Sequence, residues 1–118
     1  MPGRNSFSNL GESIYEGWCV ACHRDSGQGA PPYVPGLRNN PIVKEAEANN
    51  LVMSLLVGSS ADVTQAYSPY VHMPSFAKIL DNTEIAAVAD YLRARWGGDS
   101  GGQVPVSLPA QLRAELEQ

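Results

Sequence analysis

Both cysteines of the 118-residue chain stand three positions apart and are followed directly by a histidine, in the run Cys19-Val20-Ala21-Cys22-His23. Two thiols at this spacing can form a redox disulfide, supply half of a zinc site, or attach a cofactor covalently. These three uses require different neighbours, so the rest of the sequence helps to choose among them.

The redox and zinc uses fit the neighbouring sequence poorly. Thioredoxin-type cysteine pairs lie where a strand passes into a helix, whereas Cys19 and Cys22 fall at the end of a predicted helix with no strand pattern before it. A structural zinc ion needs four ligands, and His72 is the only histidine besides His23. The adjacent side chains of Cys22 and His23 also point poorly at one small ion in tetrahedral geometry. Both uses are therefore disfavoured.

Covalent haem attachment fits each residue of the run. In Cys-x-x-Cys-His the two thiols bond to the vinyl groups on one edge of a haem, and the histidine reaches the iron. Cys19 and Cys22 are then the thioether anchors and His23 is an axial ligand. Many haem electron carriers add a methionine sulfur as the second ligand, which favours the ferrous state and raises the reduction potential. Met73, directly before Pro74, is the candidate for that second ligand.

Two residues compete with Met73 for this role. Met53 stands among leucines on a predicted helix, so we expect it in the core. His72 could replace Met73 at the iron in a disturbed or alkaline form, although a surface position is the simpler expectation.

The first of the helices that position these groups is expected to open at Asn9, which has capping-box spacing to Glu12. It runs into the cysteine pair and stops before Gly27, since glycines and prolines fill residues 25–41. Its apolar stripe is expected to comprise Leu10, Ile14 and Trp18.

Two further helices are predicted, over residues 49–57 with a stop at Gly58 and from Asp81 to the pair Gly97-Gly98. Asp81 has capping-box spacing to Glu84. The stripe of this last helix is expected to comprise Ile85, Val88, Ala89, Leu92 and Trp96.

Shorter elements complete the prediction. Asn40 as N-cap and Pro41 at the first helical position predict a short helical turn through Ala46. Residues 97–105 resemble a flexible linker, and 108–118 predict a short amphipathic helix. No period of two persists along the chain, so no strands are expected.

Composition sets limits on the class of protein. Eleven glycines and nine prolines indicate long loops in one domain, and three short helices bury too little apolar surface to order such loops. A large, flat, apolar cofactor in the middle would supply the missing core. A net charge of -4 without a Lys/Arg cluster argues against nucleic-acid binding.

From the sequence we expect no membrane-spanning segment in these residues and no secretion signal in the first of them. Its best apolar run, residues 51–57, is far shorter than the ~20 residues that a span needs. The first residues contain no apolar stretch, so we expect either that a secretion signal has been removed or that this is a piece of a larger chain.

Taken in order along the chain, these features resemble the class I cytochromes c. They are Gly11, the pentad ending in His23, Pro35-x-Leu37, Met73-Pro74 and the helix from Asp81 to Trp96. The resemblance covers residues 9–97 and is greatest to the haem domains of bacterial cytochrome subunits that serve alcohol and gluconate dehydrogenases. It implies an all-α fold of three main helices and long loops around one covalent haem c, with residues 1–8 as an extension and 98–118 as a linker and tail.

The resemblance also implies roles for individual residues. Gly11 and either Tyr91 or Leu92 would lie where the first and last helices cross. The carbonyl of Pro35 would accept the Nδ1 proton of His23, as partners of metal-bound histidines commonly do. Leu37 and Arg38 would belong to the haem surroundings. Propionate contacts are an open option for Arg38 and for Tyr33, Tyr67, Tyr70 and Trp96.

The function implied is that of a single-electron carrier with His23 and Met73 as axial ligands, and not of an enzyme. It would pass electrons from a periplasmic quinoprotein, flavin or molybdenum dehydrogenase to a cytochrome or oxidase. The alternative is a haem enzyme, or a sensor that binds a gas or peroxide, with an open sixth coordination position.

Overall fold

The computed structural model describes residues 6–24, 26–29, 36–38, 40–58, 75–98 and 103–117. Helix α1 (Ser6–Ile14), a π-helical turn η1 (Tyr15–Cys19) and α2 (Val20–His23) form one helical run. α3 (Pro41–Lys44), α4 (Asn49–Val57), α5 (Asn82–Trp96) and α6 (Ser107–Leu116) follow. The described residues contain no strand, which confirms the all-α prediction. None of the helices described is both long and apolar enough to cross a membrane.

Helix α5 forms as its sequence predicts. The Asp81 side chain accepts from the Glu84 N–H at 2.8 Å, and the Glu84 side chain accepts from the Asp81 N–H at 2.8 Å, so the capping box is complete. Gly97 follows the last turn, and Gly98 has a positive φ. All of the predicted stripe is buried, namely Ile85, Val88, Ala89, Leu92 and Trp96.

The first and last predicted helices cross at Gly11, as expected. A Cβ atom added to Gly11 would lie 2.4 Å from the Ala87 carbonyl oxygen and 2.9 Å from the Tyr91 Cβ. α1 and α5 therefore meet backbone to backbone, because only glycine allows so close an approach. Leu92 is buried in the same helix.

Two predictions for the first helical run are wrong. The helix begins at Ser6, so Asn9 lies inside α1 and not at its N-terminus. No proline or glycine stands between Ser6 and Asn9, and nothing in the chain interrupts the helix there. Trp18 does not continue the buried stripe and is 53% exposed.

The π-helical turn explains the position of Trp18. The Val20 N–H donates to the Tyr15 carbonyl, five residues back, so η1 has one residue more per turn than an α-helix. That extra residue rotates the chain, and the buried positions become Tyr15 and Cys19.

The two short helices α3 and α4 begin where the sequence predicts, but α3 ends earlier than predicted. The Asn40 side chain accepts from the Ile42 N–H at 2.9 Å and caps α3, which ends at Lys44 and not at Ala46 because Glu45 is extended. α4 spans the predicted residues and stops at Gly58, which has a positive φ. Met53 packs against the core, as predicted.

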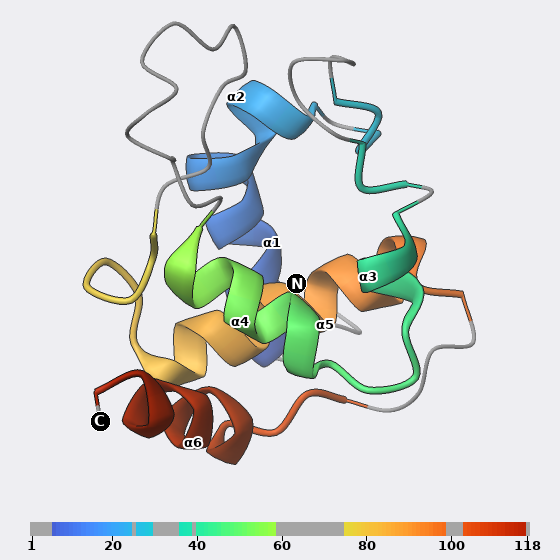
Figure 1. The fold of residues 1–118 in the computed structure, drawn as a ribbon. Helices are drawn as coiled ribbons and strands as arrows, with labels where there is room; N and C mark the ends of the chain where they lie inside the picture. The colour runs from blue at the N-terminus through green and yellow to red at the C-terminus, as the bar shows by residue number, and fades with distance from the viewer. Residues whose placement is uncertain are drawn as a thin grey trace, which may run out of the picture.

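Helix α6 confirms the predicted short helix near the end of the chain, and it packs closely against the other helices. It contacts α4 and α5 at the end of the molecule opposite α2 (Figure 1). Val104, Pro109 and Leu112 are buried. The core therefore contains Leu112 of α6 together with residues of α1, η1, α3, α4 and α5.

Candidate functional site

The cysteine–histidine run lies on the last two turns of the first helical run. Cys19 ends η1 and is 6% exposed, and His23 ends α2 and is 8% exposed. The backbone of Cys22 lies in α2, three residues after Cys19 and therefore about one turn away. Two cysteine positions about one turn apart along the backbone, and a buried histidine on the same short segment, suit the two thioether bonds and one axial bond of a c-type haem.

The backbone at His23 and directly after it is held by hydrogen bonds. The Tyr15 hydroxyl donates to the Arg24 carbonyl at 2.5 Å, and the Gly29 N–H donates to the His23 carbonyl at 3.0 Å. Arg24 has φ 69°, a left-handed conformation that is uncommon for a residue with a side chain. The chain thus turns sharply after the histidine, and Tyr15 fixes that turn.

The loop after this turn packs against an aromatic cluster. The Tyr15 ring lies 5.5 Å, between centroids, from both the Tyr91 and the Trp96 rings. Gly27 has φ +68°, and a Cβ there would lie 2.7 Å from the Trp96 ring. The indole therefore contacts the loop backbone directly, and α5 supports the segment that follows His23.

Of the three residues that we expected around the haem, two are described. The N–H groups of Leu37 and Arg38 donate to the Gly27 carbonyl at 2.7 and 3.1 Å, which joins their segment to the loop after His23. The Leu37 side chain packs on the core, while the Arg38 side chain is exposed. Pro35 lies outside the described residues.

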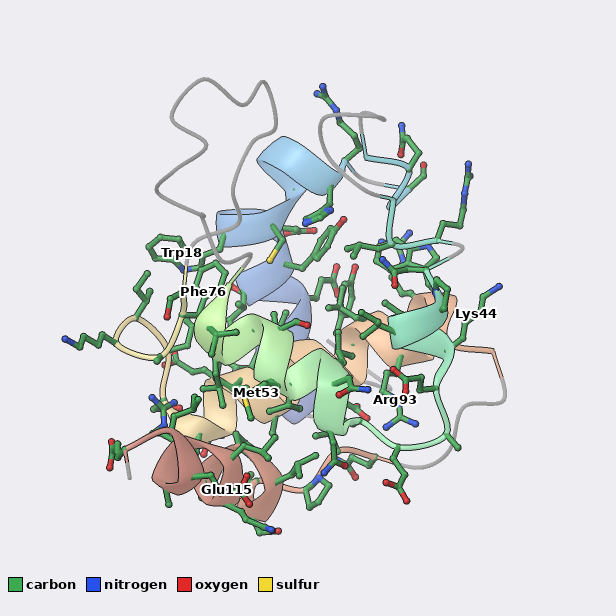
Figure 2. All side chains as sticks on the ribbon, in the orientation of Figure 1. Trp18, Lys44, Met53, Phe76, Arg93 and Glu115 are labelled. Carbon is green, nitrogen blue, oxygen red and sulfur yellow. The ribbon has the colours of Figure 1, made fainter. Side chains whose placement is uncertain are left out.

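Met73 lies outside the described residues, but the segment that follows it is described. The Ser75 hydroxyl donates to the Leu56 carbonyl, and the Phe76 N–H donates to the Leu55 carbonyl at 3.0 Å, so both residues are tied to α4. The Phe76 ring meets the Trp18 ring edge to face, with centroids 5.9 Å apart (Figure 2). A residue three positions after Met73 therefore contacts the residue directly before Cys19.

Of the other residues that the sequence singled out, one belongs to the described residues and the rest do not. Trp96 is buried against Gly27 and Tyr15. His72 and the three further tyrosines with an open propionate role, Tyr33, Tyr67 and Tyr70, lie outside the described residues.

Sequence reasoning missed two residues of this region. Tyr15 precedes Cys19 by four positions and His23 by eight, so a helical spacing placed it on their face, but nothing marked its hydroxyl as a support for the turn. Arg113 of α6 bonds to the segment that follows Ser75, and no signal in the sequence connects these distant positions.

Comparison with known proteins agrees with the site. Residues 8–96 match the family model described as cytochrome c. The chain is 30% identical over 105 residues to the cytochrome c subunit of alcohol dehydrogenase (quinone) from Gluconobacter oxydans (strain 621H), covering 89% of this chain and 22% of that protein.

Two further relatives differ in length. The gluconate 2-dehydrogenase cytochrome c subunit of Pantoea cypripedii is 28% identical over 109 residues, covering 92% of this chain and 25% of that subunit. Cytochrome c-552 of Thermus thermophilus is 34% identical over 91 residues, covering 74% of this chain and 68% of that protein. The chain thus spans about a quarter of the length of the two dehydrogenase subunits. With the buried Cys19 and His23 and the glycine-mediated helix crossing, these matches show that the chain belongs to the cytochrome c family, as a class I c-type cytochrome.

Proposed function

We propose that this chain is a single-electron carrier that holds one haem c. Cys19 and Cys22 would provide the two thioether anchors, and His23 and Met73 the two axial ligands. The chain contains two cysteines and one Cys-x-x-Cys-His run, which is enough for one covalently attached haem. In this proposal residues 9–97 form the monohaem domain, 1–8 an N-terminal extension, and 98–118 a linker and tail.

The observation that carries the proposal is the contact between Trp18 and Phe76. It brings the described flank of the methionine segment against the flank of the cysteine segment. Met73 precedes Ser75 by two residues, a chain length of at most about 7 Å. One haem-sized group held at the cysteines is therefore within reach of the methionine segment.

The residues around the site suit electron transfer without bond chemistry. When bound, the haem supplies a one-electron iron couple. A histidine on one side and a methionine on the other would leave no open position for a substrate. Tyr15 and Gly29 hold the backbone next to His23, so that ligand would move little between oxidation states. Pro35 would orient the His23 ring, and Leu37 and Arg38 would line the haem surroundings.

The names of the relatives suggest the redox partners. Two of them are cytochrome c subunits of an alcohol dehydrogenase (quinone) and of a gluconate 2-dehydrogenase. We infer a quinoprotein, flavin or molybdenum dehydrogenase as electron donor, and a cytochrome or oxidase as acceptor. We also propose a periplasmic location, because the resemblance to c-type cytochromes implies that haem is attached outside the cytoplasm.

The two methionines of the central region provide the experiment. Met73→Ala should remove the far-red ferric absorption band of the sulfur ligand, lower the reduction potential and open the iron to CO in the reduced protein. Met53→Leu is the matched control, because Met53 packs against the core and should change none of the three. Denaturation of both variants tests the bonds to the cysteines independently of the axial ligand, because covalently bound haem stays with the unfolded chain.

Two outcomes would overturn parts of this proposal. Wild-type protein that lacks the far-red band and binds CO rapidly would instead support a haem enzyme or a gas sensor. Variants with exchanged behaviour would show that Met53 is the ligand.

A further inference from the structure

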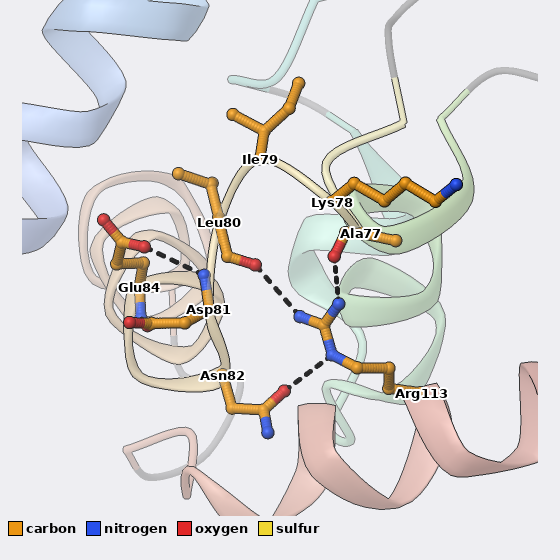
Figure 3. Close-up of a pocket in the computed structure, with 8 residues that line it drawn as sticks. All are labelled: Ala77, Lys78, Ile79, Leu80, Asp81, Asn82, Glu84 and Arg113. Carbon is orange, nitrogen blue, oxygen red and sulfur yellow. Dashed lines mark hydrogen bonds between the residues drawn. The ribbon is translucent and has the colours of Figure 1, made fainter.

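Helix α6 lies beyond the residues that match the family model, yet one of its side chains bonds to the segment after Met73. The Arg113 guanidinium donates to the carbonyls of Ala77 and Leu80, the latter at 3.0 Å. Its Nε donates to the Asn82 side chain at 2.9 Å (Figure 3). Three donors of one side chain thus fix three residues of a single turn.

This turn is the direct continuation of the methionine segment. The Phe76 carbonyl accepts from the N–H groups of Ile79 and Leu80 at 3.1 and 3.0 Å, which closes the turn. Phe76 is tied to α4 at one end of the turn, and Asp81 caps α5 at the other. Between these two ends, the Arg113 side chain bonds to the turn carbonyls of Ala77 and Leu80.

We propose that Arg113 is a positioning residue for the axial methionine: it holds the turn of residues 76–82, and the turn holds the segment that carries Met73. This inference rests on the proposed function, in which Met73 binds the iron. Met73 stands three residues before Phe76, which is tied to α4 and also closes the turn, so a looser turn should act on the ligand through Phe76. Loss of Arg113 should raise the fraction of molecules in which the methionine has left the iron.

The chemistry of the side chain explains why an arginine stands here. A guanidinium is planar and directs its N–H groups outward in a fixed fork, so one side chain can reach two carbonyls and an amide oxygen at once. A lysine ammonium is a point charge on a flexible stem and cannot reproduce that geometry. Arg113→Lys should therefore restore only part of the effect.

A second arginine in the molecule provides a matched control. Arg93 of α5 is 7% exposed and donates to the carbonyls of Glu45 and Ala46, the latter at 2.9 Å. It also bonds a non-helical segment, but that segment lies between α3 and α4. Figure 2 shows Arg93 on the opposite side of the view from Trp18 and Phe76. Arg93→Met should lower the stability of the holoprotein without affecting the methionine.

The experiment measures how readily imidazole binds the ferric holoprotein. Imidazole competes for the iron only when the methionine is off, so its apparent affinity rises with the detached fraction. Arg113→Met should raise that affinity about tenfold, as expected for lost bonds to a charged donor. It should also weaken the far-red sulfur band, and Arg113→Lys should show smaller changes of the same sign.

Each outcome of this experiment decides the inference. It is overturned if Arg113→Met binds imidazole no better than wild type, or if Arg93→Met improves binding as much. If Arg113→Met yields no holoprotein, the imidazole affinities of Arg113→Lys and Arg93→Lys are compared instead. A higher affinity in Arg113→Lys alone supports the inference, and equal affinities overturn it. A wild-type protein that lacks the sulfur band would refute Met73 as ligand, which is a failure of the proposed function. A normal wild-type band with unchanged Arg113 variants would refute only the role of Arg113.

Discussion

Two helical regions of the molecule cross each other and differ in regularity. α5 keeps one helical period from its capping box to Gly97, and its whole predicted stripe is buried. The run from Ser6 to His23 changes period at η1, where Tyr15 and Cys19 turn inward and Trp18 turns outward. The regular helix contributes packing surface, and the irregular run carries the residues for haem attachment. A π-helical turn inside a helix often marks a functional site, because it redirects side chains that a regular helix would place elsewhere.

The crossing itself gives the largest expected effect. Gly11→Ala would press a methyl group against the Ala87 carbonyl, and we expect it to lower the free energy of unfolding by roughly 1–3 kcal/mol. Gly17 lies six residues later in the same run, and a Cβ there meets nothing within 4 Å. Gly17→Ala should raise the free energy of unfolding by roughly 0.5–1 kcal/mol, since alanine favours the helix. Denaturant unfolding of both holoproteins tests the difference. If both substitutions change the free energy of unfolding in the same direction, the close approach of Gly11 to the Ala87 backbone is contradicted.

The capping box tests the regular helix. Asp81→Ala removes the acceptor for the Glu84 N–H and should lower the free energy of unfolding by about 1 kcal/mol. Asp81→Ser keeps a capping oxygen and should recover most of that loss. If α5 is only a scaffold, both variants will keep the far-red sulfur band of the wild type. A change in that band would show that the start of α5 also acts on the methionine segment.

The smallest expected effect concerns the irregular run. Tyr15→Phe keeps the ring contacts with Tyr91 and Trp96 but loses the hydroxyl that donates to the Arg24 carbonyl. We expect a loss of roughly 0.5–1.5 kcal/mol in the free energy of unfolding, as for one hydrogen bond. Tyr91→Phe is the control, because the hydroxyl of Tyr91 accepts a solvent-exposed hydrogen bond from Arg95, and such surface changes usually stay within about 0.5 kcal/mol. Equal losses in thermal melts of the two variants would argue against Tyr15 as the support of the turn after His23.

Local sequence determined much of this protein. The pentad at residues 19–23, together with Met73-Pro74 and the other motifs along the chain, indicates a covalently attached haem. Capping residues and apolar periods predicted α4, α5 and the start of α3, because caps and stripes act over three or four residues. Gly11 was expected at the crossing from the family resemblance, and the contact with Ala87 bears this out.

Other features were decided by tertiary structure. A π-helical turn costs regular hydrogen bonding and persists because burial of Tyr15 against Tyr91 and Trp96 outweighs the loss, and those partners stand more than 70 residues later. In the same way, α6 packs on α4 and α5, and Arg113 reaches Ala77 across 36 residues. Contacts between such distant residues depend on how the helices are arranged in space, and a local pattern in the sequence does not record that arrangement.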